Sequence, residues 1–140
     1  MPPDRPRLHW RDIALVGVGG SFGTAARYLV SEGIPGWQGM PTATLVINVV
    51  GAFALGLLLE RLVRAGSDAG IRHSLRLGLG TGFLGGFTTY SALAVDTTQL
   101  AAAGHFGAAM LYAGATVVVG AIATVLGILA AGRRRTRGIR

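Results

Sequence analysis

The sequence predicts an all-α membrane protein with four transmembrane helices, the third of which is broken near its middle. The first observation is composition: 51% of the residues are hydrophobic, only 14% are charged, and mean hydropathy is +0.53. So few charges cannot cover the surface of a soluble protein of this size. The second is that four apolar segments are each long enough to cross about 30 Å of hydrocarbon as a helix. The third is a run of glycine and polar residues inside the third segment.

The four predicted spans form a single transmembrane domain over residues 1–140. They cover approximately residues 12–30, 42–63, 75–100 and 106–131. The first span follows basic residues, as a signal peptide does, but its apolar character continues to Val30 and three further spans follow. We therefore interpret it as a retained helix.

The net charge of +7 comes entirely from arginine, because the 13 basic residues include no lysine. All but one of them lie near the start of the chain, around the junction of the second and third spans, or after the fourth: Arg5, Arg7, Arg11, Arg61, Arg64, Arg72, Arg76, Arg133, Arg134, Arg135, Arg137 and Arg140. By the positive-inside rule, the basic termini 1–11 and 133–140 and the middle loop are cytoplasmic. A basic run beside a long apolar segment is typical of contact with anionic lipid headgroups, so we do not expect nucleic-acid binding.

The first span contains the sequence GGSFGTAARY at residues 19–28. Gly19 and Gly23 share one helix face, and small residues on such a face let a neighbouring helix approach closely. Arg27, toward the far end of the first span, is the one arginine outside this cytoplasmic pattern. Its side chain either reaches the outer interface or pairs with a polar group inside the bundle, with Glu32 as a candidate partner. We expect a structural role for it.

The second span contains TLVINVVG at residues 44–51, with Asn48 inside the apolar run. A carboxamide in mid-span costs free energy unless it is hydrogen-bonded, and it offers both donors and an acceptor. Asn48 therefore either joins two helices or contacts a polar species that crosses the membrane.

The third span contains GTGFLGGFTTYSAL at residues 80–93, in which the polar run TTYS (88–91) follows a pair of glycines. Non-helical backbone at membrane depth is tolerated only where protein buries it or water reaches it. The break is therefore either a packing kink or a functional site. In a functional site, freed carbonyl groups coordinate a cation, and freed amides and hydroxyls meet an anion.

The fourth span places Tyr112, Thr116 and Gly120 on one stripe at i+4 spacing. No span carries an acidic residue near its centre, which argues against a proton-coupled pump. The chain has no cysteine, and its three histidines lack the spacing of metal ligands. No nucleophile–base pair or metal triad is evident in the sequence, so we do not expect an enzyme.

Taken together and in this order, the four motifs resemble those of the CrcB/Fluc family of fluoride channels. The family pattern GGxxGxxxRY corresponds to GGSFGTAARY, and GGxTTFSTF corresponds to GGFTTYSAL at residues 85–93. The second-span pattern of Thr-Leu, Asn and Gly corresponds to TLVINVVG, and the fourth-span pattern of Tyr/Asn, Ser and Gly corresponds to Tyr112, Thr116 and Gly120. The match extends over nearly the whole chain.

The resemblance implies a fluoride-selective channel subunit in a bacterial inner (plasma) membrane, which exports cytoplasmic fluoride passively and confers fluoride resistance. It implies an antiparallel, dual-topology dimer with two pores, in which the broken third helices meet. Backbone carbonyls, on this chain those of Gly85 and Thr88, would then hold a structural sodium ion (Na+) at the dimer centre. The residues that would line the fluoride pore are Asn48, Thr89, Tyr90, Ser91, Leu93 and Thr116.

The sequence departs from the family at two positions, because Tyr90 and Leu93 stand where the family has phenylalanine. Aromatic ring edges are electropositive and can face an anion, whereas leucine has no quadrupole to offer. The charge pattern is also unusual. An antiparallel homodimer needs one chain to insert in both orientations, and these arginines favour a single orientation. We therefore expect an oppositely oriented homologous chain as the partner.

Two alternatives are consistent with the four spans. The chain is a non-conducting structural subunit that stabilises a conducting partner, or it is a small multidrug-type transporter. The transporter would need a glutamate in mid-membrane, and this chain has none there.

Overall fold

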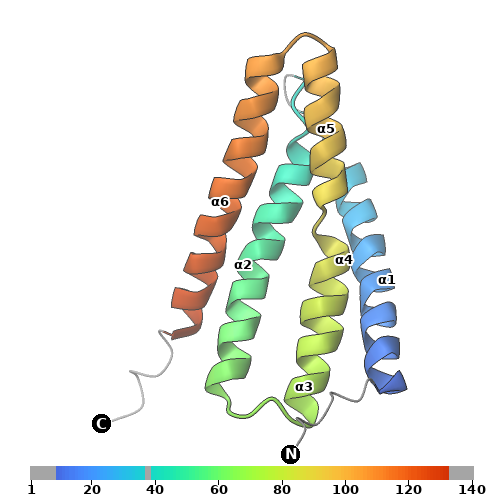
Figure 1. Ribbon diagram of the computed structural model, residues 1–140, viewed down its shortest axis with the longest axis vertical. Coiled ribbons are helices and arrows are strands. Elements are labelled where there is room, and N and C mark those ends of the chain that lie inside the picture. The colour runs from blue at the N-terminus through green and yellow to red at the C-terminus, as the bar shows by residue number, and fades with distance from the viewer. Residues whose placement is uncertain (1–8, 37–38, 133–140) are drawn as a thin grey trace, which may run out of the picture.

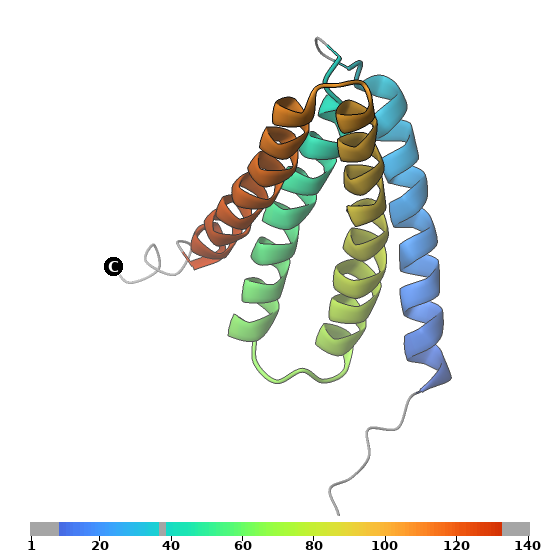
Figure 2. The ribbon, with the colours of Figure 1, turned by 45° about the horizontal axis from the view of Figure 1, so that its top comes forward.

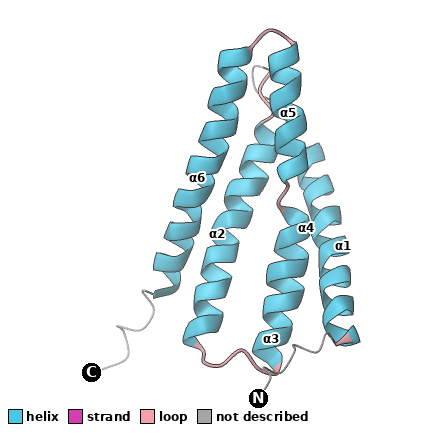
Figure 3. Cartoon of the chain, viewed as in Figure 1, coloured by secondary structure: helices cyan, strands magenta, loops and turns pink. Residues whose placement is uncertain are grey.

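The structure is a computed structural model that describes residues 9–36 and 39–132. Within these ranges it consists of helices and their connections, with no β-strand (Figures 1 and 3). The helices are α1 (Trp10–Gly33), α2 (Thr42–Arg64), α3 (Ile71–Leu75), η1 (Arg76–Leu84), α4 (Gly85–Phe87), α5 (Tyr90–Ala102) and α6 (Phe106–Gly132). The predicted all-α class is confirmed. The predicted basic tail 133–140 and all but the last residues of the basic segment 1–11 lie outside the described ranges.

Four helical segments run along the bundle. α1, α2 and α6 contain 24, 23 and 27 residues, and each is long and apolar enough to cross a membrane. The remaining segment consists of α3, η1 and α4, which follow one another without a gap, and of α5, which begins after two non-helical residues. The chain alternates in direction, so the Trp10 and Gly132 ends point toward the same end of the bundle (Figure 1).

The break changes the helix against which the third segment packs. Before the break, η1 and α4 contact α1, and after it α5 contacts α6. α2 lies beside both pieces and packs extensively against α6. In Figures 1 and 2 the broken segment therefore runs between α1 on one side and α2 with α6 on the other. The break itself lies in the middle of the bundle.

Glycines let the helices approach closely, as the sequence predicts for Gly19 and Gly23. A Cβ atom at Gly23 would overlap the carbonyl oxygen of Phe83, and one at Gly19 would overlap the backbone of η1. α2 and α6 meet in the same way, because Gly56 and Gly127 each face a backbone carbonyl of the other helix. Close backbone contact of this kind is the usual way in which helices associate in lipid.

The buried core of the single chain is small and lies mainly between α2 and α6. Ile47 on α2 is 2% exposed, and Ala109, Tyr112 and Thr116 on α6 are equally enclosed. Most large apolar side chains are exposed, Phe22 on α1 among them. This distribution suits helices whose outer surfaces contact lipid or another chain.

Candidate functional site

Two residues in extended conformation break the third helical segment. α4 ends at Phe87 and α5 begins at Tyr90. Between them, Thr88 has ψ 157°, and Thr89 has φ −149° and ψ 124°. Extended residues cannot continue the helical hydrogen-bond pattern, so the break frees backbone N–H and C=O groups that need other partners.

The side chain of Asn48 binds both backbone groups of Thr89. Asn48 Oδ1 accepts from the Thr89 N–H at 2.8 Å, and Asn48 Nδ2 donates to the Thr89 carbonyl at 2.9 Å. One turn further along α2, Gly51 lies against the methyl group of Thr88, with no room for a Cβ atom. Asn48 thus joins two helical segments, which is one of its two predicted roles. Its carboxamide carries two N–H donors, and this pair of bonds uses one of them.

Two side chains of α1 bind a carbonyl on the other side of the break. Arg27 Nε donates to the Gly86 carbonyl oxygen at 3.3 Å, and Thr24 Oγ1 donates to the same oxygen at 3.4 Å. The ion pairs among the described residues include none between Arg27 and its candidate partner Glu32, and the guanidinium contacts the Gly86 carbonyl instead. Arg27 therefore contacts a polar group inside the bundle, and that group is backbone.

The carbonyls of Gly85 and Thr88, predicted to hold a cation, both lose their helical donors at the break. In a continuous helix they would accept from the N–H groups of Thr89 and Ala92. The Thr89 N–H donates to Asn48 instead, and the Ala92 N–H donates to Thr89 Oγ1 at 3.1 Å. The Thr88 hydroxyl does not replace them, because it donates to the Leu84 carbonyl at 2.9 Å.

A groove of about 330 Å³ lies beside the break, between α2, α5 and α6. With Thr88, it is lined by most of the residues predicted to form the pore: Asn48, Thr89, Tyr90, Leu93 and Thr116. Ser91 is the exception and lies outside this lining, with its hydroxyl 3.2 Å from Thr89 Oγ1. The structure thus brings together residues from three helical segments on one surface.

The lining residues differ in what they offer a ligand. Tyr90 is 82% exposed, whereas Leu93 is 7% exposed and Thr116 is 4% exposed. The Thr116 hydroxyl donates to the Tyr112 carbonyl at 2.8 Å, so it presents lone pairs to the groove and its proton is already used. Thr89 Oγ1 accepts from the backbone, which leaves its own proton to donate to Ser91 or to a ligand.

Two polar contacts outside the groove lining were not predicted from the sequence. The Tyr112 hydroxyl lies 3.2 Å from Asp96 Oδ2 and 3.1 Å from the Pro41 carbonyl, and it joins α6 to α5 and to the loop before α2. Thr24 shares the carbonyl that Arg27 binds. The role of Thr24 could have been predicted from the sequence. Thr24 precedes Arg27 by three residues, so the two side chains lie on the same helix face.

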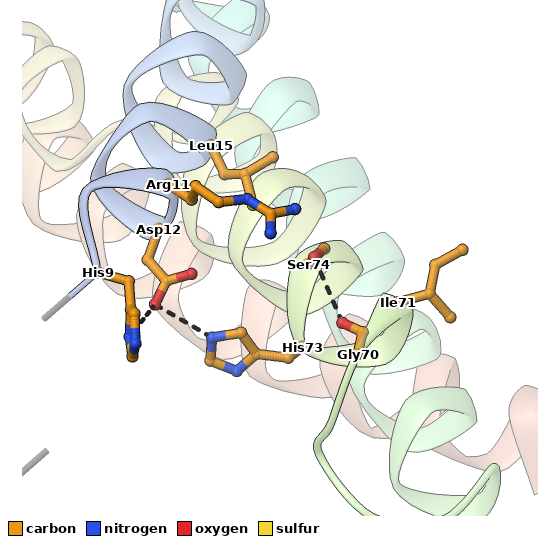
Figure 4. A pocket seen from close by; sticks show the side chains of 8 residues that line it. All are labelled: His9, Arg11, Asp12, Leu15, Gly70, Ile71, His73 and Ser74. Atoms are coloured by element: carbon orange, nitrogen blue, oxygen red, sulfur yellow. Dashed lines mark hydrogen bonds and ion pairs between the residues drawn. The ribbon is translucent and has the colours of Figure 1, made fainter. Parts of the chain in front are cut away.

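A second polar cluster lies where α1 and α3 begin (Figure 4). Asp12 Oδ2 is 3.4 Å from His73 Nε2 and 3.9 Å from His9 Nδ1, and both rings face the carboxylate. Asp68 Oδ2 lies 3.5 Å from His73 Nδ1 and 2.7 Å from Arg76 Nη2. The hydrogen bond from Arg76 holds the pKa of Asp68 below its ordinary value.

These two histidines are far apart in the sequence, and their meeting at one carboxylate is a feature that the sequence did not predict. A cavity of about 540 Å³ adjoins the cluster and is lined in part by Arg11 and Ser74. Within residues 9–36 and 39–132, no three His, Cys, Asp or Glu side chains are placed to hold a metal ion. Within the cluster, the contact of Asp12 with His73 links α1 to the start of the third segment.

Comparison with known proteins gives consistent matches over most of the chain. Residues 14–128 match the family described as CrcB-like protein, Camphor Resistance (CrcB). The chain is 54% identical over 121 residues to the fluoride-specific ion channel FluC 2 of Leifsonia xyli subsp. xyli (strain CTCB07), covering 86% of this chain and 83% of that protein. It is 46% identical over 111 residues to the fluoride-specific ion channel FluC 1 of Cutibacterium acnes, and the match covers 79% of this chain and 78% of that protein. It is 40% identical over 121 residues to the fluoride-specific ion channel FluC of Geobacter sulfurreducens, and the match covers 85% of this chain and 95% of that protein.

Proposed function

The chain belongs to the CrcB family, and from this premise we propose that it is a subunit of a fluoride-selective channel in a cell membrane. Fluoride leaves the cytoplasm through it passively, and the cell is thereby protected from fluoride toxicity. The subunit is a channel component and not an enzyme. The names of its relatives in three organisms support this function over that of a multidrug-type transporter.

The groove beside the broken helix is the observation that carries the proposal. Fluoride is small and holds its water tightly, so a pore must replace that water with converging hydrogen-bond donors. The groove offers the second Nδ2 N–H of Asn48 and the hydroxyl proton of Thr89. A narrow path lined by such donors favours fluoride over the larger chloride ion.

The aromatic ring of Tyr90 adds to these donors. Its ring edge is electropositive, and at 82% exposure it lies at the open side of the groove. Leu93 contributes apolar bulk alone. Thr116 contributes hydroxyl lone pairs that can accept from water entering the groove, and Ser91, outside the groove lining, adds a hydroxyl in contact with Thr89 Oγ1.

The exposed helix faces and the two carbonyls without helical donors support an antiparallel dimer centred on the break. The carbonyls of Gly85 and Thr88, joined by those of a second chain, form a set of hard oxygen ligands that suits sodium. When bound, sodium supplies positive charge at the centre of the assembly and holds the two broken helices together.

The arginine pattern supports a partner that is a different chain. Arg61, Arg64, Arg72 and Arg76 lie around the connection of α2 to α3, whereas the loops at the other end of the bundle contain no arginine or lysine. Both chain termini are then cytoplasmic, in a bacterial inner membrane. A homologue with the opposite bias completes the antiparallel pair. The numbered names FluC 1 and FluC 2 among the relatives fit such paired sets.

Fluoride efflux from liposomes, followed with a fluoride electrode, tests the proposed function. Liposomes that contain this chain with its partner should release fluoride much faster than chloride. Liposomes that contain this chain alone should release neither. Equal release of the two anions by the pair would contradict a fluoride-selective channel.

A non-conducting role for this chain is the second candidate, favoured by leucine at position 93. Asn48→Ala in this chain, tested within the pair, separates the two roles. A pore-lining Asn48 predicts loss of most fluoride efflux, because the groove loses its carboxamide donor. Unchanged efflux would identify the chain as a structural subunit.

A further inference from the structure

The backbone groups that the break frees are divided among nearby side chains. Asn48 binds the N–H and the carbonyl of Thr89, at 2.8 and 2.9 Å. Arg27 and Thr24 bind the carbonyl of Gly86, at 3.3 and 3.4 Å. These side chains come from α2 and α1, on opposite sides of the broken segment. Together they hold two groups that the break frees, the Thr89 N–H and the Gly86 carbonyl, and they bind the carbonyl of the N-cap residue Thr89 as well.

These side-chain contacts also affect which carbonyl groups at the break are left without a donor. Gly85 would regain its helical donor if the Thr89 N–H turned back toward it, and the Asn48 Oδ1 atom prevents this. Gly86 lies next in the chain, and its carbonyl is occupied by α1. Side chains outside the break therefore decide whether the carbonyls of Gly85 and Gly86 are available, whereas Thr89 Oγ1, inside the break, takes the N–H that would have bound the Thr88 carbonyl.

We propose that Asn48 and Arg27 are positioning residues for a cation site at the break: Asn48 keeps the Gly85 carbonyl available to the ion, and Arg27 withdraws the neighbouring Gly86 carbonyl from it. This inference rests on the proposed function, in which the carbonyls of Gly85 and Thr88 bind sodium. For Asn48 it adds a second role that is separate from any contact with fluoride. For Arg27 it replaces a general anchoring role with control of one backbone oxygen.

Removal of Asn48 should close the break toward a helix. A backbone N–H without a partner at membrane depth is costly, so the Thr89 N–H would turn to the Gly85 carbonyl. Cation binding would then lose one of its ligands. Asn48→Asp keeps an oxygen acceptor for the Thr89 N–H, whereas Asn48→Leu keeps only the approximate volume.

The test compares sodium-dependent stability with fluoride efflux in the full chain, purified together with its partner. Thermal unfolding is followed at increasing NaCl, with KCl at the same ionic strength as the reference. Asn48→Leu should raise the sodium concentration for half-maximal stabilisation by about tenfold or more, as expected for a lost ligand geometry. Asn48→Asp should leave the sodium concentration for half-maximal stabilisation near the value of the unmodified protein. Both variants should lose fluoride efflux.

Arg27 is tested with a matched control on the same helix. Arg27→Gln and Thr24→Val release the Gly86 carbonyl and should weaken the sodium-dependent stabilisation, the arginine variant more strongly. Ser21→Ala should not, because the Ser21 hydroxyl binds only the Gly17 carbonyl of its own helix.

The outcomes separate this inference from the proposed function. Sodium-dependent stabilisation that survives in both Asn48→Leu and Arg27→Gln would overturn the positioning roles, whatever the efflux. Asn48→Asp behaving like Asn48→Leu would overturn the acceptor role of Asn48. An unmodified pair that gains no stability from sodium would refute the cation site and this inference with it. Absence of fluoride efflux from a pair that sodium does stabilise would count against the channel function alone.

Discussion

Asn48 shows how one side chain can join two helices and still line a groove. Its carboxamide satisfies two backbone groups of Thr89 and still lines the groove with a remaining donor. The sequence indicated both roles as alternatives, and the structure makes them compatible. At this scale, the number of hydrogen-bond sites on a residue decides whether two roles exclude each other.

Leu93 is the residue at which this chain departs most from the aromatic pattern of its family. It is 7% exposed, and a further cavity of about 630 Å³ borders it together with Tyr90 and Val117. Leu93→Phe therefore has room, and it should leave fluoride efflux by the pair unchanged if the pore at this position is inactive. A large gain in efflux would instead identify the leucine-containing pore as the conducting one.

Asp68 provides a prediction for acid pH. Its pKa is lowered in the folded chain by the hydrogen bond from Arg76, so it binds a proton less readily than in the unfolded chain. Its stabilising contribution is therefore present above the ordinary value of about 4 and is lost as the pH falls through the lowered value. Asp68→Asn should remove this contribution at neutral pH, and thermal unfolding should show a small difference there that disappears in strong acid. A difference that grew on acidification would contradict the prediction.

The contact of α1 with the broken segment can be tested at the scale of elements. A Cβ atom at Gly23 would overlap the Phe83 carbonyl oxygen, whereas Gly17 on the same helix has open space around it. Gly23→Ala should therefore destabilise the fold by about 1–3 kcal/mol, as overpacking does. Gly17→Ala should be neutral or slightly stabilising, because alanine favours helix. Unfolding in detergent measures both, and equal effects would show that the close approach is unimportant.

Helices were easier to predict than the contacts between them, and the reason is physical. Apolar runs and their interruptions are local, so the ranges 12–30, 42–63, 75–100 and 106–131 lie close to the observed helices. The break lies at the first two residues of TTYS, whereas Tyr90 and Ser91 begin α5. The bond of Asn48 to Thr89 depends on how α2 packs beside the break, and no local pattern records that. The same holds for Arg27, whose observed partner is a carbonyl on another segment and not Glu32.

At the scale of the whole molecule, the distribution of arginine predicts a single orientation in the membrane. The chain contains no cysteine, so single cysteines at exposed sites report on each side without background. Ala69→Cys, between α2 and α3, should react with an impermeant reagent only after the cell is opened. Ala103→Cys, between α5 and α6, should react in intact cells. Labelling of each site from both sides would show dual insertion and remove the main argument for a different partner chain.

The two extended residues Thr88 and Thr89 also bear on how many times the chain crosses the membrane. Within the part of the chain that the structure describes, only α1, α2 and α6 are uninterrupted helices long enough to cross a membrane, and α5 with its 13 residues is too short to cross alone. A count of intact helices is therefore odd and would assign the two ends of the chain to opposite compartments. Joined across the break, α3 to α5 supply the fourth traverse, which makes the count even. Reporter proteins fused before Trp10 and after Gly132 should consequently report from the same compartment.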